Sequence, residues 1–108
     1  MSYKIFTIPP FDRQLKRLAK KYPSLKKEFL KLLSEIEENP KQGDGMGKDC
    51  YKIRFAISSK GKGKRGGARV ILNVMVDDKR VYLLSIYDKS DKANLSDKEL
   101  SDLLSYVI

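Results

Sequence analysis

The side chains best suited to chemistry in this sequence are cations and a phenol on three neighbouring segments. Lys52 and Arg54 alternate with apolar residues, which predicts a strand from which both cations project on one face, away from the core. Arg69 begins the next predicted strand, and Tyr87 and Lys89 stand at the end of the one after it. Consecutive strands commonly lie side by side, so these five side chains could converge. We take them as the candidate catalytic residues.

Amines and guanidinium groups gathered in this way can cleave RNA without a metal or a histidine. The ribose 2′-OH attacks the adjacent phosphate, and an arginine stabilises the charge that develops in the transition state. A lysine whose pKa is lowered by like-charged neighbours can accept or donate the proton, whereas arginine stays protonated and cannot be the base. Tyr87 as base or acid requires an altered pKa, and a tyrosine packed at the sheet edge with a wet hydroxyl fits the sequence as well.

Two further residues beside this cluster have simpler interpretations. Cys50 is interpreted as a small buried apolar residue rather than a nucleophile. Asp88 is interpreted as a turn residue at a strand end, or as a partner of Lys89, rather than a catalytic carboxylate.

The composition excludes several classes of function. The 108 residues carry a formal net charge of +9 and include no histidine and one cysteine. Without histidine, zinc-hydrolase, Ser-His and Cys-His designs are excluded, and we expect no metal and no cofactor. A lone cysteine suits a reducing compartment, and no secretory signal pattern or apolar run of roughly 20 residues occurs. We therefore expect a cytoplasmic protein without a membrane partner.

Most of the excess charge is concentrated in residues 48–69, which hold eight basic residues against one acidic residue. Residues 61–66 satisfy the pattern G-x-G-x-x-G, but they join two predicted strands instead of opening a helix, and no P-loop ending follows. We interpret the segment 58–67 as a mobile loop whose cations follow a phosphate backbone, although a solvated loop kept for solubility is the alternative. The candidate RNA-binding residues are Lys48, Lys60, Lys62, Lys64 and Arg65.

The elements that must position these residues can be predicted from periodicity. Alternation predicts strands over 3–8, 50–57, 68–76 and 81–87, whereas helical spacing predicts an antiparallel hairpin over 11–22 and 25–39, with Ser24 as N-cap. Residues 41–47, with three glycines, are predicted as a loop. A capping box at Ser96 and Glu99 starts a C-terminal helix. The predicted fold is one α+β domain, 1–108, of order β-α-α-β-β-β-α: an antiparallel sheet packed against a helical hairpin, with a C-terminal helix.

The order of elements and three sequence segments together resemble a known family. The segments are 47–54 (GKDCYKIR), 68–71 (ARVI) and 82–90 (YLLSIYDKS). The chain resembles the RelE branch of the RelE/ParE superfamily of type II toxin–antitoxin toxins. Its long loop over 58–67 and its full C-terminal helix are closer to a HigB-like subgroup.

The resemblance implies a toxin that enters the ribosomal A site and cuts mRNA with Lys and Arg side chains and no metal. It also implies a cognate antitoxin that wraps the toxin, and the ribosome with its mRNA and rRNA as the other partner. Lys52 and Arg69 match family residues, Arg54 stands where a second lysine occurs, and Lys89 aligns with a later arginine. The family's base-stacking tyrosine has no clear equivalent near residues 94–96, and Tyr87 could replace it.

Two alternatives remain at this stage. A ParE-like inhibitor of DNA gyrase would share the fold and act by protein binding, and a non-catalytic RNA-binding module would use the same basic surface. Cleavage requires a cluster of cations on one strand face, whereas gyrase inhibition does not.

Overall fold

The computed structural model describes residues 2–61, 66–92 and 94–107. The observed elements, in chain order, are β1 (Lys4–Thr7), α1 (Pro9–Lys21), α2 (Leu25–Glu38), β2 (Asp44–Gly47), β3 (Cys50–Phe55), the 3-10 helix η1 (Ser58–Lys60), β4 (Ala68–Met75), β5 (Arg80–Asp88) and α3 (Asp97–Leu104). The predicted order is confirmed, with β2 and η1 as additions. No helix in the described ranges is long and apolar enough to cross a membrane.

The five strands form a single sheet in the order β1-β5-β4-β3-β2. β3, β4 and β5 pair antiparallel, which confirms the predicted meander. β1 pairs parallel with β5, so the sheet is mixed rather than wholly antiparallel. Parallel neighbours need a long connection between them, and here the chain from α1 through β4 lies between β1 and β5. β4 and β5 are consequently interior strands.

The segment 41–47, predicted as a loop, instead contains the edge strand β2. A Cβ on Gly43 would lie 2.2 Å from the carbonyl oxygen of Lys52, so only glycine allows this approach of the two chains. Gly47 has a φ of +83°, and the next two residues, Lys48 and Asp49, also have positive φ values of 56° and 60°. Two such residues between paired strands form the tight turn that matches the twist of a hairpin. The glycines therefore serve strand pairing here, not loop flexibility.

The helical hairpin and the capping box form as their sequences predict. α1 begins with prolines and buries Phe11 and Leu18, and α2 buries residues at helical spacing, including Phe29. The rings of Phe11 and Phe29 lie 5.8 Å apart between centroids. Ser96 caps α3 through a complete capping box with Glu99. Ser24 occupies the N-cap position of α2, but its side chain makes no cap; it bonds Glu28 and Ser59 instead.

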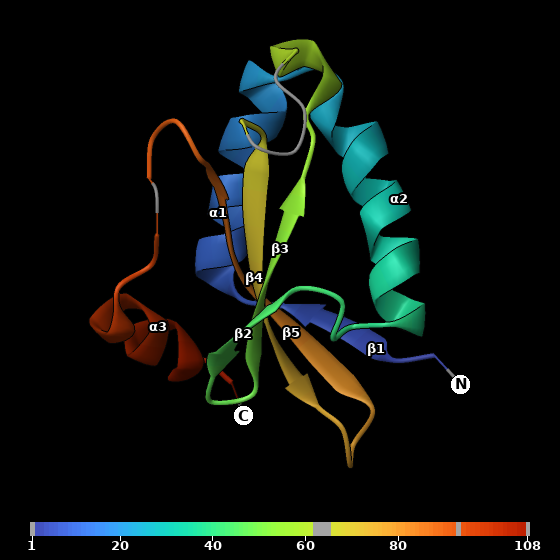
Figure 1. Cartoon of the computed structure of the whole chain (residues 1–108), viewed down its shortest axis with the longest axis vertical. Coiled ribbons are helices and arrows are strands. Elements are labelled where there is room, and N and C mark those ends of the chain that lie inside the picture. The colour runs from blue at the N-terminus through green and yellow to red at the C-terminus, as the bar shows by residue number, and fades with distance from the viewer. Residues whose placement is uncertain (1, 62–65, 93, 108) are drawn as a thin grey trace.

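The core lies between the sheet and the helices. Figure 1 shows the α1–α2 hairpin beside the sheet, with α3 set apart from the hairpin near the C terminus. β4 and β5 are buried along almost their whole length, and Leu100 anchors α3 to the same core. Cys50 is buried and free, and burial raises the pKa of its thiol, which fits the predicted apolar role. This framework holds β3, β4 and β5 in a fixed register.

Candidate active site

The strand register places three of the candidate catalytic residues in one row. Arg54 on β3 pairs with Arg69 on β4, and Arg69 pairs with Tyr87 on β5. Paired residues on neighbouring strands project from the same face of a sheet, and Lys52, two residues before Arg54, projects from that face as well. Lys89 follows β5, and its N–H donates to the carbonyl of Gly67, 3.1 Å away, at the same end of the sheet. We call Lys52, Arg54, Arg69, Tyr87 and Lys89 the strand face.

The middle of the strand face is buried and its borders are open. Arg69 is 3% exposed and Tyr87 8% exposed, whereas Arg54 and Lys89 are exposed. The Arg69 guanidinium donates to the carbonyl of Ala68 at 3.1 Å. Burial lowers the pKa of Arg69, and the neighbouring Arg54 lowers it further, but a guanidinium still stays protonated at neutral pH. A fixed, poorly solvated positive charge therefore lies at the centre of the row.

Tyr87 is a neutral phenol in an unusual position. Burial raises the pKa of Tyr87, and the charge of Arg69 only partly opposes this. Its hydroxyl is buried and has no hydrogen-bond partner among the described residues, so the expectation of a wet hydroxyl at the sheet edge is wrong. Most buried hydroxyls in proteins bond a protein group or an ordered water. The raised pKa disfavours Tyr87 as a base and leaves it suited to donate a hydrogen bond or proton.

Two lysines connect the strand face to the C-terminal segment. Lys52 Nζ donates to Asn94 Oδ1 at 3.3 Å, and Lys48 Nζ donates to Ser101 Oγ at 2.9 Å. Both partners are neutral side chains, so neither contact is an ion pair. Arg54 pairs with Asp44 on β2 at 3.8 Å, but both side chains are more than half exposed, and such a pair restrains little. The cations of β3 are thus oriented without being neutralised by buried carboxylates.

Lys60 lies in a different setting from the one predicted for an RNA-binding cation. Its amine is 2.5 Å from Asp88 Oδ1, and the Lys60 side chain is only 7% exposed. It also donates to Ser90 Oγ at 2.8 Å. Because this charge is already neutralised by a buried carboxylate, we no longer assign Lys60 to RNA binding. Lys62, Lys64 and Arg65 lie outside the described residues.

Asp88 is more than a turn residue, and its ionic partner is Lys60 rather than the expected Lys89. The Asp88 side chain is fully buried; it accepts hydrogen bonds from the Tyr22 hydroxyl, from Lys60 and from the Ser90 N–H at 2.9 Å. Burial by itself raises the pKa of Asp88, but these hydrogen bonds outweigh it and hold the pKa well below its ordinary value. We call Tyr22, Lys60, Asp88 and Ser90 the Asp88 cluster.

Comparison with known proteins assigns the family. The family described as "RelE toxin of RelE / RelB toxin-antitoxin system" matches residues 4–106. The chain belongs to the RelE toxin family. A mutant of E. coli toxin RelE in the free state is similar in structure, with a TM-score of 0.63 at 21% identity over all of both chains. The RelBE2 toxin–antitoxin complex of Mycobacterium tuberculosis matches with a TM-score of 0.57 at 14% identity, over 84% of this chain and 95% of the other.

This RelE-family toxin carries a second basic region, on the helical hairpin, that sequence reasoning did not single out. Between Arg13 and Lys31 there are eight basic residues and one acidic residue, Glu28, whose carboxylate is bound by Ser58. We call the eight cations, all exposed, the hairpin face: Arg13, Lys16, Arg17, Lys20, Lys21, Lys26, Lys27 and Lys31. This local excess of positive charge can be seen in the sequence. A net charge summed over residues 1–47 hides it, because acidic residues before Arg13 and after Lys31 offset the cations.

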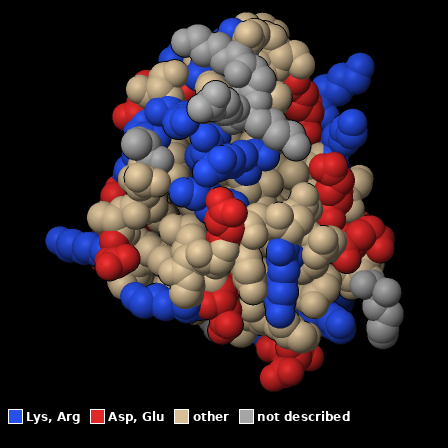
Figure 2. Space-filling model, viewed as in Figure 1, with Lys and Arg blue, Asp and Glu red and all other residues tan. Residues whose placement is uncertain are grey.

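The turn between α1 and α2 lies close to η1 and to the end of β5. Ser24, at the turn between α1 and α2, lies 2.8 Å from Ser59 of η1 through their hydroxyls, and Lys21 Nζ is 3.9 Å from Asp88. Figure 2 shows Lys and Arg side chains gathered in the upper part of one face, where Figure 1 shows β3 ending and β4 beginning.

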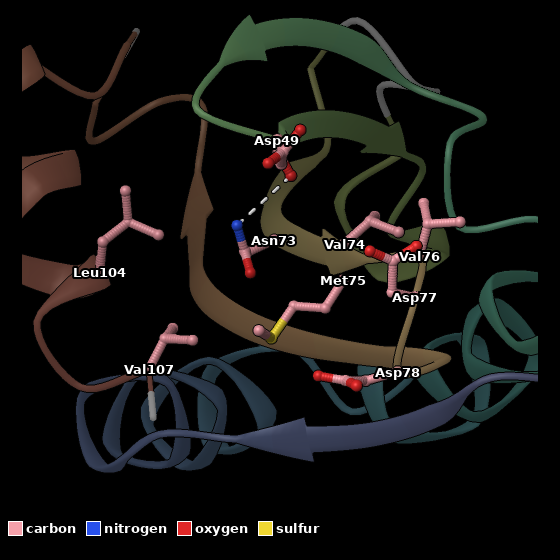
Figure 3. Close-up of a pocket in the computed structure, with 9 residues that line it drawn as sticks. All are labelled: Asp49, Asn73, Val74, Met75, Val76, Asp77, Asp78, Leu104 and Val107. Atoms are coloured by element: carbon pink, nitrogen blue, oxygen red, sulfur yellow. Dashed lines mark hydrogen bonds between the residues drawn. The ribbon is translucent and has the colours of Figure 1, made fainter.

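A cavity of about 550 Å³ lies away from both basic regions, between the β4–β5 turn and the end of α3. Figure 3 shows Asp49, Asp77 and Asp78 around it, with Leu104 and Val107 on one side. These carboxylates would repel a phosphate, so the cavity is not part of the same anion-binding site. No group of three His, Cys, Asp or Glu side chains suited to a metal ion occurs in the described part of the chain.

Proposed function

We propose that this toxin is a ribosome-dependent endoribonuclease that cuts mRNA in the ribosomal A site and so inhibits translation. The observation that carries the proposal is the cross-strand row Arg54–Arg69–Tyr87, flanked by Lys52 and Lys89. It places positive charge and a proton-donating hydroxyl on one face, with the central guanidinium shielded from water. Charge that develops on a phosphate is stabilised most strongly by fixed groups in a poorly solvated site.

The cleavage step follows from these roles. The 2′-oxygen of the ribose forms a bond to the adjacent phosphorus, the bond from phosphorus to the 5′-oxygen breaks, and the products end in a 2′,3′-cyclic phosphate and a 5′-hydroxyl. Lys52 or Lys89, in the neutral amine form that a base requires, takes the 2′ proton, and Arg69 with Arg54 stabilises the phosphorane-like transition state. Tyr87, which its raised pKa keeps protonated, supplies a proton or hydrogen bond to the leaving oxygen, and this step requires RNA to reach the buried hydroxyl. No step requires a metal.

The partners follow from charge and from the relatives. Contacts to mRNA and rRNA phosphates come from Lys48, the hairpin face and the cations of residues 62–65. These contacts depend on charge rather than on an exact geometry. E. coli RelE has been determined with its antitoxin in the RelBE complex, a structure that matches this one with a TM-score of 0.59 at 21% identity, over 81% of this chain and 96% of the other. We propose a cognate antitoxin here as well, and a cytoplasmic site of action beside the ribosome.

The experiment combines purified ribosomes and mRNA with the protein and maps the 5′ ends of the products. We expect cuts in phase with codons, abolished in the variant Lys52→Ala plus Arg69→Ala. The matched control Lys41→Ala plus Arg80→Ala removes one lysine and one arginine outside the strand face, and it should cut like the wild type. Intact mRNA with all folded proteins would contradict the proposal. Stalled DNA gyrase would then support a gyrase inhibitor, and RNA binding without cuts would support a non-catalytic module.

A further inference from the structure

One buried carboxylate, that of Asp88, joins three elements that are distant in sequence. Tyr22 caps the end of α1, Lys60 ends η1, and Ser90 follows β5. All three bond the two oxygens of Asp88: Lys60 and the Ser90 N–H bond Oδ1, at 2.5 Å and 2.9 Å, and the Tyr22 hydroxyl bonds Oδ2. The side chain is 0% exposed, so these contacts are shielded from water. Charge-assisted hydrogen bonds in such surroundings are strong and directional.

The position of Asp88 in the chain connects the Asp88 cluster to the strand face. Side chains alternate along a strand, so Tyr87 and Lys89 project from the opposite face of β5 to Asp88. Fastening Asp88 to α1 and η1 on one side therefore fixes where Tyr87 and Lys89 lie on the other. On that other side, the Lys89 N–H bonds the carbonyl of Gly67, which directly precedes β4.

We infer that Asp88 is a positioning residue for the RNA-cleaving site: its carboxylate holds the end of β5 against α1 and η1 in one arrangement, so that Tyr87 and Lys89 meet the same RNA. The inference rests on the proposed function. Asp88 does not touch RNA, because both of its oxygens are bound within the Asp88 cluster and its side chain lies on the opposite face of β5 from Tyr87. Its negative charge does not repel phosphate at the site, because Lys60 is bound directly to it.

An ionic link suits this role better than an apolar contact of the same size. Apolar contacts are non-directional and tolerate sliding, whereas a carboxylate with three hydrogen-bond donors has a single arrangement that satisfies them all. Removing one partner of a buried pair leaves an uncompensated charge, so single variants affect stability as well as position. Removing both charges together separates the two effects.

The test compares wild type, Asp88→Asn, and the double variant Lys60→Met plus Asp88→Asn, all assayed for ribosome-dependent cleavage below their melting temperatures. We expect Asp88→Asn to lower kcat by about tenfold or more with KM within about twofold, because misplacement of catalytic groups acts on the chemical step. The double variant should regain melting temperature yet keep the low kcat. Asp77→Asn, in the exposed β4–β5 turn, is the matched control and should cleave normally.

A second readout measures position without activity. Amide hydrogen exchange in Asp88→Asn should accelerate at Lys60, Gly61, Lys89 and Ser90 and stay unchanged in the middle of β3. Wild-type kcat in Asp88→Asn, a kcat that follows melting temperature in the double variant, or unchanged exchange at these amides would each overturn the inference. If the wild type itself makes no cuts, the proposed function fails instead, and the exchange pattern shows whether the link at Asp88 still exists.

Discussion

The strand face and the hairpin face carry similar positive charge and differ in how that charge is held. The strand face draws its groups from three strands, buries Arg69 and Tyr87, and fixes their separation through the register of β3, β4 and β5. The hairpin face spreads eight cations along two helices, and every one of them is exposed. Long exposed side chains keep their rotamer freedom and are screened by salt, so they attract a polyanion without orienting it.

The comparison indicates that the strand face serves the chemistry and the hairpin face serves the binding of the polyanion. Chemistry needs groups that are already in place and poorly hydrated, which only the strand face provides. Attraction and docking need charge over a large area, which the hairpin face provides. Substitutions that keep charge but change geometry should therefore harm the strand face alone, and substitutions that remove charge from the hairpin should act on affinity alone.

Arg69→Lys gives the largest expected effect, because it keeps the charge and removes the planar guanidinium with its several donors. We expect kcat to fall by about 100-fold to 1000-fold, the usual loss when a donor to a developing charge is removed. Single-turnover cleavage on ribosomes measures this, with melting temperature recorded alongside. Lys16→Arg plus Lys20→Arg on the hairpin face also exchanges side chains at constant charge and should leave kcat unchanged. Equal effects in the two variants would remove the distinction between the faces.

Tyr87→Phe removes only the buried hydroxyl that has no described partner. We expect kcat to fall by about 100-fold, within the range of general acid catalysis, while the protein becomes equally or more stable. The stability gain follows because an unsatisfied buried hydroxyl costs about 1–3 kcal/mol. Cleavage rates and thermal unfolding measure the two parts separately. A stable variant with wild-type kcat would show that the hydroxyl takes no part in the reaction.

Much of the fold could be predicted from periodicity, because each element repeats its signal over several residues. The α1–α2 hairpin, the meander of β3, β4 and β5 and the capping box of α3 were all predicted in this way. β2 was missed because three glycines indicate a loop locally, whereas the reason for Gly43 is a contact with Lys52 nine residues later. The parallel pairing of β1 was missed because it depends on a partner more than 70 residues away.

The candidate site was predictable to the extent that strand alternation decides which side chains share a face. Lys52 and Arg54 follow from alternation alone, and pairing with Arg69 and Tyr87 needs only the meander register. The ion pair of Lys60 could not be predicted from the sequence. Lys60 belongs to a basic segment of the chain, but its amine binds Asp88, 28 residues later. A lysine's charge can be read from sequence, but whether a carboxylate already neutralises it depends on long-range packing.

Neutralising part of the hairpin face should have a moderate effect confined to binding. In Lys16→Gln plus Arg17→Gln plus Lys20→Gln we expect KM to rise about threefold to tenfold at physiological salt with kcat unchanged, because phosphate contacts supply affinity without specificity. The slope of log affinity for ribosomes against log salt should become shallower by about 2 to 3, close to one unit per lost cation. An unchanged slope would mean that the hairpin face is merely solvated.

Asp44→Asn probes the border of the strand face and should have the smallest effect. It removes the exposed partner of Arg54, which lies 3.8 Å away, and both side chains are more than half exposed. Exposed pairs contribute about 0–1 kcal/mol, so the free energy of unfolding should change by no more than that. Cleavage should stay within about twofold of the wild type, because water and salt already screen this pair. A tenfold loss of kcat in Asp44→Asn would show that Arg54, like Arg69, depends on being held in place, and the fixed part of the strand face would then extend to the edge of the sheet.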